Sequence, residues 1–576
     1  MKNLKKVLNF FTSKEYRRGF VFLILGLFFG MILEVIGLGI LLPVLNILLD
    51  QEKLLSYDFF DKFVKIFDLS YRSVQNFLLL GLMVFYFFRS LFLIGLVYYK
   101  NRFLANLTFS TGNKMIFNYL NVDYNFHMKN SSSKLIKNFQ VELHLFMEFI
   151  HSFLTLITEF TIALSIVLTL IFIEPKATFF TIIIIFFFAF FFLYVIRNPI
   201  SKWGNEREQI DNNIAKLLSE SIVSIRELKI FQKENFYFQR FKKSNYTKAS
   251  ITKNQKTLSQ IPRYYFEFVA VLGLLIFIIA LTLDGNEIKG ILIKISIFLV
   301  GIFRILPSLN RIIGAYQKLN FHLPSYRIIE ENLNLTIETT DEILNKNIFN
   351  HSIRFENVSF GYDNSDTIFD QINVEFFKGQ RIGVIGESGS GKSTFIDLLI
   401  SFVKPSRGVI LIDDQNLNNV RHSWNNLIGY VPQSIMLLDE SIKQNIAFGV
   451  DEQDIDEVVL NSVLKAVCLD KYFKRNNIDI EKKIGERGVK LSGGQIQRIG
   501  IARALYKNPK ILIFDEATSA LDKTTEDEII DSIYSLSKDI TIFIISHRTD
   551  VLKRCDKIYK VYSKHLNQLD SNDEAL

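Results

Sequence analysis

The chain of 576 residues is too long for one hydrophobic core, so we expect two or more domains. Its formal charge of +8 is compatible with nucleic-acid binding, but a hydrophobic fraction of 49% with 55 Phe indicates lipid as the surroundings, and we expect no nucleic-acid partner. The two cysteines, Cys468 and Cys555, provide no disulfide framework and fit a reducing cytosol.

The composition changes along the chain. Residues 1–325 contain long apolar runs that predict an all-α membrane domain, whereas residues 350–576 alternate charged and apolar positions like a soluble α/β domain. Residues 326–349 are expected to link the two domains. Because a helix that crosses a bilayer needs about 20 mostly apolar residues, we expect six spans. They cover about 20–48, 77–99, 151–173, 177–196, 264–283 and 288–310.

Lysine and arginine concentrate before residue 20, in 100–150 and in 197–260. Since basic loops stay on the cytoplasmic side of a membrane, all three stretches are expected there. The connections at 174–176 and 284–289 are then short outer turns. An even number of spans returns the soluble half to the cytoplasm, where ATP is.

The two long inner loops are polar but helix-patterned, without clusters of Pro or Gly, and we expect them to extend the spans into the cytoplasm. Apolar positions at 124–126 and 214–225 could dock on the soluble domain. A solvated helical hairpin is the alternative. On the outer side, residues 58–69 place four Phe near one helical face and predict either a helix lying on the bilayer surface or a short packed connector.

Arg89 lies near the middle of the second predicted span, where an arginine costs roughly 2.5–3.5 kcal/mol on insertion scales. It is too deep to reach the headgroups easily. We therefore expect it to pair with an acid such as Glu34 or Glu159, or to face a wet cavity.

Three further arginines, Arg263, Arg304 and Arg311, lie at the inner ends of the fifth and sixth spans. Arg263 and Arg311 could also extend to the cytoplasmic headgroups. A cavity lined by several arginines suits an anionic cargo, because the guanidinium fork binds phosphate oxygens in pairs. We therefore expect these three residues and Arg89 to contact the substrate.

The soluble half contains a phosphate-binding loop. An apolar run at 381–385 predicts a strand, and 395–400 predicts a helix. Between them, glycines allow backbone N–H groups to turn toward one anion at the start of a helix. Lys392 can reach the β- and γ-phosphates of ATP, and the Ser393 hydroxyl can bind Mg²⁺. The loop residues expected to bind ATP are Gly386, Glu387, Ser388, Gly389, Ser390, Gly391, Lys392, Ser393 and Thr394.

Five more positions complete the expected ATP site. Tyr362 offers an aromatic face for adenine, and the Gln433 side chain can bridge to Mg²⁺. Asp515 and Glu516 end a buried strand, where Asp515 would hold Mg²⁺ and Glu516 would act as general base on the attacking water. His547 follows a second strand and can contact the γ-phosphate. Glu516, His547, Gln433 and Lys392 are the expected catalytic residues.

The sequence Leu491-Ser492-Gly493-Gly494-Gln495 carries a resemblance to the ATP-binding cassette (ABC) transporters. The resemblance covers the whole chain, as one six-helix membrane domain of the exporter type fused to one nucleotide-binding domain. It implies a homodimer in which these five residues, the signature motif, contact ATP held by the other copy. The residues acting in trans would be Ser492, Gly493, Gly494, Gln495 and Asp522, and Gly485-Glu486-Arg487-Gly488 is similar to the exporter loop that touches the membrane domain.

Within that family, segments 85–89, 262–264 and 303–313 are similar to bacterial flippases of lipid-linked oligosaccharides for protein glycosylation. This implies an ATP- and Mg²⁺-dependent homodimer in the bacterial inner (cytoplasmic) membrane. Its cargo would be a polyprenyl-pyrophosphate glycan, with 58–69 contacting the lipid. An exporter of a lipid A-like lipid, a peptide or a drug is the alternative.

Overall fold

The computed structural model describes ten segments, and they form two compact units. The first unit comprises Met1–Val122 and Phe126–Ile337, and the second comprises Asp123–Asn125 and Glu338–Leu576. The described residues are 16–49, 71–173, 175–283, 288–337, 348–362, 367–485, 491–517, 523–536, 539–546 and 552–569.

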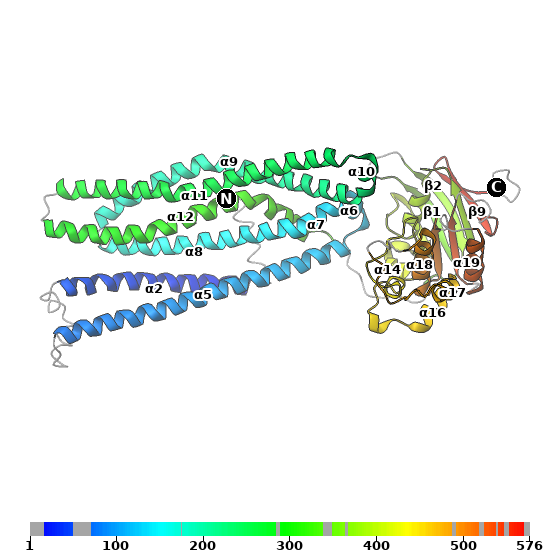
Figure 1. Ribbon diagram of the computed structural model, residues 1–576, viewed down its shortest axis with the longest axis horizontal. Helices are drawn as coiled ribbons and strands as arrows, with labels where there is room; N and C mark the ends of the chain where they lie inside the picture. Colours follow the sequence, from blue (N-terminus) through cyan, green and yellow to red (C-terminus); the bar gives the residue numbers. More distant parts are fainter. Residues whose placement is uncertain are drawn as a thin grey trace. The chain divides into compact units, whose positions relative to one another are not determined.

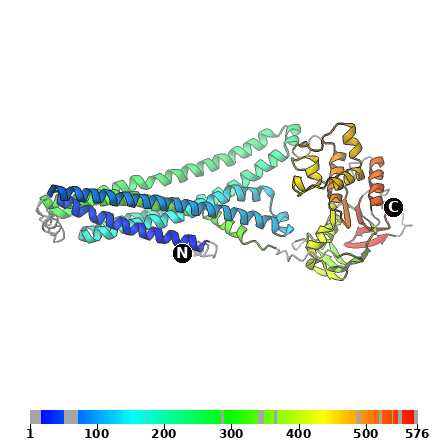
Figure 2. The same ribbon diagram turned by 90° about the horizontal axis from the view of Figure 1, so that it is seen from below.

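Long helices form the first unit and run side by side in both views (Figures 1 and 2). Lengths of 31 to 51 residues carry them well beyond the expected spans, so the two inner loops are helical extensions as predicted. The long helices are α2 (Arg17–Leu49), α5 (Tyr71–Asn121), α8 (Leu143–Ile173), α9 (Pro175–Val223), α11 (Glu234–Leu283) and α12 (Ile288–Leu333). The short elements are α6 (Tyr124–Lys129), α7 (Ser132–Lys137), the π-helix η1 (Asn138–Glu142) and α10 (Ile225–Phe231).

Four stretches of the described chain are long and apolar enough to cross a membrane. They are Arg17–Gly37, Asn76–Asn121, Ser132–Phe172 and Ile182–Val223. The predicted number of six spans is therefore not confirmed. The other two expected segments are helical and belong to α11 and α12. The expected outer helix at 58–69 lies outside the described residues. Of the outer turns expected at 174–176 and 284–289, residues 174 and 284–287 are also outside them, whereas 175–176 and 288–289 already belong to α9 and α12.

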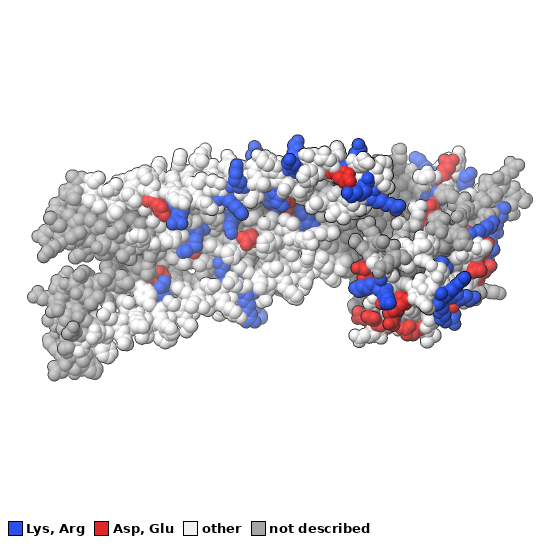
Figure 3. All heavy atoms as spheres, viewed as in Figure 1, with Lys and Arg blue, Asp and Glu red and all other residues white. Residues whose placement is uncertain are grey.

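Two large apolar cores, and a small cluster around Ile166 and Ile305, hold the helices together. One joins α2, α5, α8 and α12 through residues such as Leu107 and Ile150, and the other joins α9, α11 and α12 through Phe266 and Ile313. Helix α12 continues to Leu333, into the stretch expected to be a linker, because its last turns bury Tyr326 and Ile329 in the first core. Figure 3 shows an almost uncharged surface over much of α2 and α5 and charges of both signs on the second unit.

The second unit contains two sheets. A four-stranded antiparallel sheet has the order β2-β1-β4-β5, and a six-stranded sheet has the order β10-β9-β3-β8-β7-β6, parallel except for β10. The strands are β1 (Ser352–Phe360), β2 (Phe369–Phe377), β3 (Arg381–Gly386), β4 (Arg407–Ile412), β5 (Gln415–Asn416), β6 (Ile428–Val431), β7 (Ile511–Asp515), β8 (Thr541–Ile545), β9 (Lys557–Tyr562) and β10 (His565–Leu569).

Helices complete this unit, with α16 to α19 grouped beside the sheets (Figure 1). The α-helices are α13 (Lys392–Leu399), α14 (Arg421–Asn426), α15 (Ile442–Ile446), α16 (Glu457–Ala466), α17 (Asp470–Arg475), α18 (Gly493–Tyr506) and α19 (Lys523–Leu536), and the 3₁₀ turns are η2 (Leu417–Asn419) and η3 (Glu452–Asp454).

The interior strand β7, between β6 and β8, shows why a buried strand of this sheet has an unbroken apolar sequence. Ile511 and Ile513 point into one core, shared with β1, β3 and α13, while Leu512 and Phe514 point into a second core, shared with α16 and α18. A parallel strand covered on both faces needs no polar side. The carboxyl ends of β3 and β7 therefore meet at one edge of a firmly packed sheet, and the functional loops begin there.

Candidate active site

The loop between β3 and α13 has the predicted strand–turn–helix form. Gly389 and Gly391 adopt positive φ angles of 81° and 109°, which side chains rarely tolerate. A Cβ atom on Gly386 would lie 2.5 Å from Ser390 Oγ and 2.8 Å from the Val561 carbonyl oxygen. Glycine is thus required at these positions for the backbone to curl tightly before the helix.

Lys392 lies at the centre of this loop. Its side chain is buried, and Nζ donates to the carbonyl oxygens of Gly386 (2.8 Å) and Glu387 (2.9 Å). The Ser390 Oγ is buried and has no hydrogen-bond partner among the described residues. A cationic ammonium, an unpartnered hydroxyl and a helix N-terminus at one point fit a nucleotide phosphate.

The two predicted carboxylates occupy different environments. Asp515 ends β7 and accepts a hydrogen bond from the Tyr430 hydroxyl (3.2 Å), whereas Glu516 follows with φ at 52°. The Gln433 amide donates to Glu516 Oε2 (2.7 Å). A non-glycine residue in the left-handed region is held there by surrounding structure, here including the bond from Glu516 N to the Ile545 carbonyl oxygen (3.0 Å). Glu516 is therefore fixed in place beside Gln433.

The pKa of Asp515 lies above its usual value, mainly because of burial, and the neighbouring Glu516 carboxylate raises it further. The hydrogen bond from Tyr430 and the charge of Lys392 lower this pKa in part. A carboxylate that is partly removed from water is stabilised in its charged form by a nearby cation. Asp515 is therefore a suitable oxygen ligand for Mg²⁺. The exposed Ser393 hydroxyl and the exposed Gln433 amide offer two further oxygen ligands. The donor set, oxygen throughout, is the one that this ion prefers.

Replacing Tyr430 by phenylalanine should move the acid limb of Mg²⁺-dependent ATP hydrolysis to higher pH. Without the hydroxyl, the pKa of Asp515 rises further, and its carboxylate is protonated earlier as the pH falls. The pH profile of phosphate release at limiting Mg²⁺ measures this shift, with the exposed Tyr562→Phe as control. An unchanged acid limb would show that Asp515 does not set it.

Tyr362 contacts the helix that follows the phosphate-binding loop through its hydroxyl, and its ring packs against another aromatic side chain. Its hydroxyl donates to Asp397 Oδ2 on α13 (3.2 Å), and its ring packs edge-on against Phe360 at 4.9 Å between centroids. These contacts fix the ring next to the helix that carries Lys392. Stacking on adenine remains a prediction.

The signature residues begin another helix. Ser492 caps α18 by accepting from the Gln495 backbone N–H (3.3 Å), and the Gln495 side chain accepts in return from Ser492 N (2.8 Å). Gly493 and Gly494 form the first turn of α18, which packs on α15, α16 and β6, whereas α13 packs on β3. The signature thus presents its own helix N-terminus, and the contact with a second copy's nucleotide remains a prediction.

Arg503, which sequence reasoning missed, ties this helix to the segment after Gln433. Its guanidinium donates to the carbonyl oxygens of Met436 (3.0 Å) and Asn445 (2.8 Å) and to Asn445 Oδ1 (3.0 Å). Asn445 is fully buried. A basic residue within an apolar helix run was the available signal. His547, Asp522 and residues 486–490 lie outside the described residues.

The membrane-domain arginines are paired with acids. Arg89 on α5 pairs with Glu34 on α2, one of the two partners expected for it, and Tyr86 lies beneath its guanidinium at 5.3 Å. Arg311 pairs with Glu159 through Nε (2.6 Å), and its side chain stays 54% exposed. Arg263 is exposed and pairs with Glu267 one turn away on α11 (3.3 Å). Arg304 lies on α12, and its side chain is outside the described residues.

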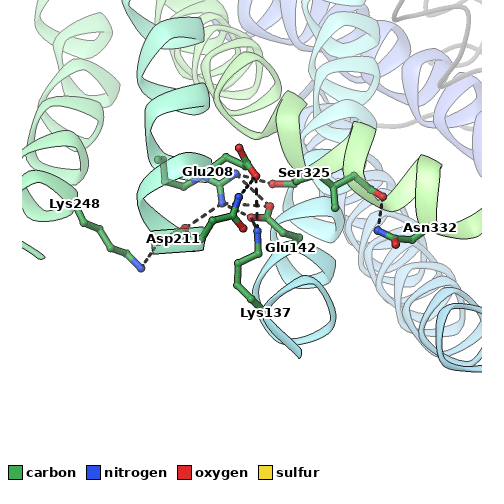
Figure 4. Close-up of polar contacts among 10 residues, drawn as sticks. Lys137, Glu142, Glu208, Asp211, Lys248, Ser325 and Asn332 are labelled. Atoms are coloured by element: carbon green, nitrogen blue, oxygen red, sulfur yellow. Dashed lines mark hydrogen bonds and ion pairs between the residues drawn. The ribbon is translucent and has the colours of Figure 1, made fainter. Parts of the chain in front are cut away.

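A buried ionic cluster, also missed from the sequence, joins α7, η1, α9, α11 and α12 of the first unit (Figure 4). Arg207 on α9 donates to Glu142 on η1 (3.1 Å), Asp211 (3.2 Å) and Ser325 on α12 (2.9 Å). Lys137 reaches Glu142 (3.0 Å), and Lys248 on α11 reaches Asp211 (2.7 Å). The i,i+4 pair of Arg207 and Asp211 was visible in the sequence, but its partners on other helices were not.

Replacing Arg207 by methionine should destabilise the protein by about 3–5 kcal/mol, because it leaves Glu142 and Asp211 with fewer counter-charges in a buried site. Thermal unfolding in detergent should show the loss as a lower midpoint. Lys202→Met, on an exposed part of the same helix, should change it little. Equal midpoints for the two variants would mean that the cluster does not hold these helices together.

Comparison with known proteins supports this geometry. A family model described as ABC transporter matches residues 369–519, and one described as ABC transporter transmembrane region matches residues 18–300. A solved bacterial Atm1-family ABC exporter with ATP bound shares the fold, with a TM-score of 0.77 and 22% identity over 96% of this chain and 95% of that one.

Curated relatives differ in their printed cargo. The lactococcin-G-processing and transport ATP-binding protein LagD of Lactococcus lactis subsp. lactis is 28% identical over 84% of this chain and 69% of that protein. The ATM1-type heavy metal exporter of Novosphingobium aromaticivorans is 34% identical over 51% of this chain and 48% of that protein. The chain thus matches between about half and about two thirds of these relatives' own length.

Proposed function

Since the chain belongs to the ABC transporters, as an exporter half-transporter whose ATPase is coupled to transport, we propose that two copies form the working unit. We further propose that the cargo is an anionic glycolipid, a polyprenyl-pyrophosphate-linked oligosaccharide. It would move from the cytoplasmic to the outer leaflet of a bacterial inner membrane.

The exposed guanidinium of Arg311 is the observation that most supports an anionic cargo. It lies on α12 of the membrane unit, and its ion pair with Glu159 is made through Nε (2.6 Å). Arginine can then bind a second anion through its remaining N–H groups. Arg89, Arg263 and Arg304 would add guanidinium N–H donors along the same path.

The residues of the candidate active site would each have a separate role in binding and hydrolysing ATP. Lys392 and the loop N–H groups would bind the phosphates, and Glu516 would take a proton from the attacking water. Gln433 holds Glu516 through a 2.7 Å hydrogen bond, so a movement of Gln433 would change the orientation of the base. Bound Mg²⁺, held by Ser393, Gln433 and Asp515, would offset negative charge on the phosphates. Ser492 and the other signature residues would close the site of the second copy.

A cargo-dependent ATPase assay in vesicles tests the proposal. Polyprenyl-pyrophosphate glycan should stimulate hydrolysis and appear in the opposite leaflet, whereas hydrophobic cations should do neither. The double variant Arg89→Ala/Arg304→Ala should lose the stimulation. Normal glycolipid transport by that variant would contradict the role of the two arginines.

A peptide cargo is the second candidate, favoured by the similarity to the lactococcin-G transport protein. A lipid A-like lipid or a drug would use the same ATP chemistry, so only the cargo assay separates them. Stimulation by peptides, with none by glycolipid, would replace the first proposal by the second.

A further inference from the structure

A cavity of about 470 Å³ lies between α8, α9, α11 and α12 of the membrane unit, and it opens to the surface at exposed lining residues such as Leu164 and Phe186. Its volume falls within the range of roughly 300–1,000 Å³ that is usual for small-molecule sites. The ATP chemistry does not use it. Small side chains create much of the space: Ala163, Ala189, Ala270 and Gly273 line it, and a Cβ atom on Gly273 would meet nothing within 4 Å.

The lining excludes polar ligands. Aliphatic and aromatic side chains make up the wall, and Thr178 supplies the hydroxyl among the lining residues that the structure describes. That hydroxyl already donates to the Leu170 carbonyl oxygen (2.9 Å). An apolar cavity of this kind does not hold ordered water, because water needs several polar partners. A hydrocarbon is the ligand that fits.

Two charged residues, Glu159 and Arg311, neighbour the apolar lining of the cavity in sequence. Phe160 lines the cavity directly after Glu159, and Leu309 and Ile312 line it on either side of Arg311. The Glu159 carboxylate keeps one oxygen, Oε2, buried without a hydrogen-bond partner among the described residues. The exposed part of the Arg311 guanidinium can face a phosphate that enters with a chain. The arrangement suits a ligand with an apolar tail and an anionic head.

We propose that this cavity binds one hydrocarbon chain of a phosphate-bearing lipid, with the phosphate beside Arg311. A bilayer phospholipid and a polyprenyl phosphate share this chemistry. The site therefore does not depend on the proposed cargo. Bound there, the chain would fill the space between the α9–α11 pair and the α8–α12 pair and would hold the two pairs together.

Photo-crosslinking tests the site with the full-length protein in nanodiscs. Phosphatidylglycerol with a diazirine in its acyl chain and a photoactivatable undecaprenyl phosphate are the two probes, and mass spectrometry locates the labelled residues. We expect labels at buried lining residues such as Val269 and Ile305, measured relative to labels at the exposed Phe87 on α5. Labelling by the first probe alone identifies a resident phospholipid, and preference for the second identifies the cargo chain. Either result supports the site.

Gly273→Leu should fill the cavity and lower labelling of the lining at least tenfold. Gly95→Leu is the matched control, because its Cβ also meets nothing within 4 Å but its position on α5 is exposed. Arg311→Gln should reduce labelling by phosphatidylglycerol to the level of a diacylglycerol probe with the same acyl chains, which lacks the phosphate. Equal labelling of the lining in Gly273→Leu and the parent would overturn the proposal. So would crosslinks from a photoreactive residue in place of the buried Val269 to a second copy of the chain instead of to lipid.

Discussion

Glu516→Gln should lower ATP turnover by about 10²–10⁴-fold, the usual contribution of a general base. The amide keeps the size of the side chain but cannot take a proton from water. Its contact with Gln433, now 2.7 Å from Glu516 Oε2, can persist because an amide oxygen also accepts a hydrogen bond. ATP binding should therefore survive, and the ATP-bound dimer should accumulate. Phosphate release and retained radiolabelled ATP measure the two effects.

Glu452→Gln is a suitable control for this experiment, because Glu452 is exposed on η3, remote in sequence from both site strands. It should hydrolyse ATP at the parent rate. If Glu516→Gln also does so, Glu516 is not the base.

Lys392→Ala should reduce hydrolysis by at least about 10²-fold, as expected when a preorganised donor to developing negative charge is removed. Unlike the change at Glu516, it should also weaken ATP binding, because the ammonium is the cation at the centre of the loop. The loop loses the two hydrogen bonds that Lys392 makes to Gly386 and Glu387. Steady-state hydrolysis and binding of a fluorescent ATP analogue separate the two losses.

The exposed Lys471→Ala on α17 should leave both quantities unchanged. A comparable thermal midpoint for the two variants would show that the loss does not come from unfolding. Near-parent hydrolysis by Lys392→Ala would exclude this loop as the phosphate site.

Local features of the second unit could be predicted from sequence. The loop before Lys392 depends on neighbours within a few residues, so its geometry follows from glycine chemistry. The cap that Ser492 provides for α18 is equally local, but the family resemblance had implied only a contact with ATP for that residue. The positions of Asp515 and Glu516 could be predicted because they directly follow a continuous apolar run, which is typical of a strand buried on both faces.

Contacts between distant segments could not be predicted in the same way. The sequence left Glu34 and Glu159 open as partners of Arg89, and the structure assigns Glu34 to Arg89 and Glu159 to Arg311. The cluster around Arg207 combines residues more than 100 positions apart, which no local pattern connects. The extension of α12 into the expected linker likewise depends on burial against other helices, and hydropathy alone does not reveal it.

Mixing two inactive variants tests most directly whether ATP is enclosed between two copies of the chain. Lys392→Ala loses the phosphate loop and Ser492→Arg blocks the signature, each in a Glu516→Gln background that retains bound ATP. If the signature acts in trans, a mixed dimer has one intact site, formed by the loop of one chain and the signature of the other. We predict ATP occlusion in the mixed dimer and none in either variant alone. Occlusion by a single variant, or none in the mixed dimer, would contradict the account.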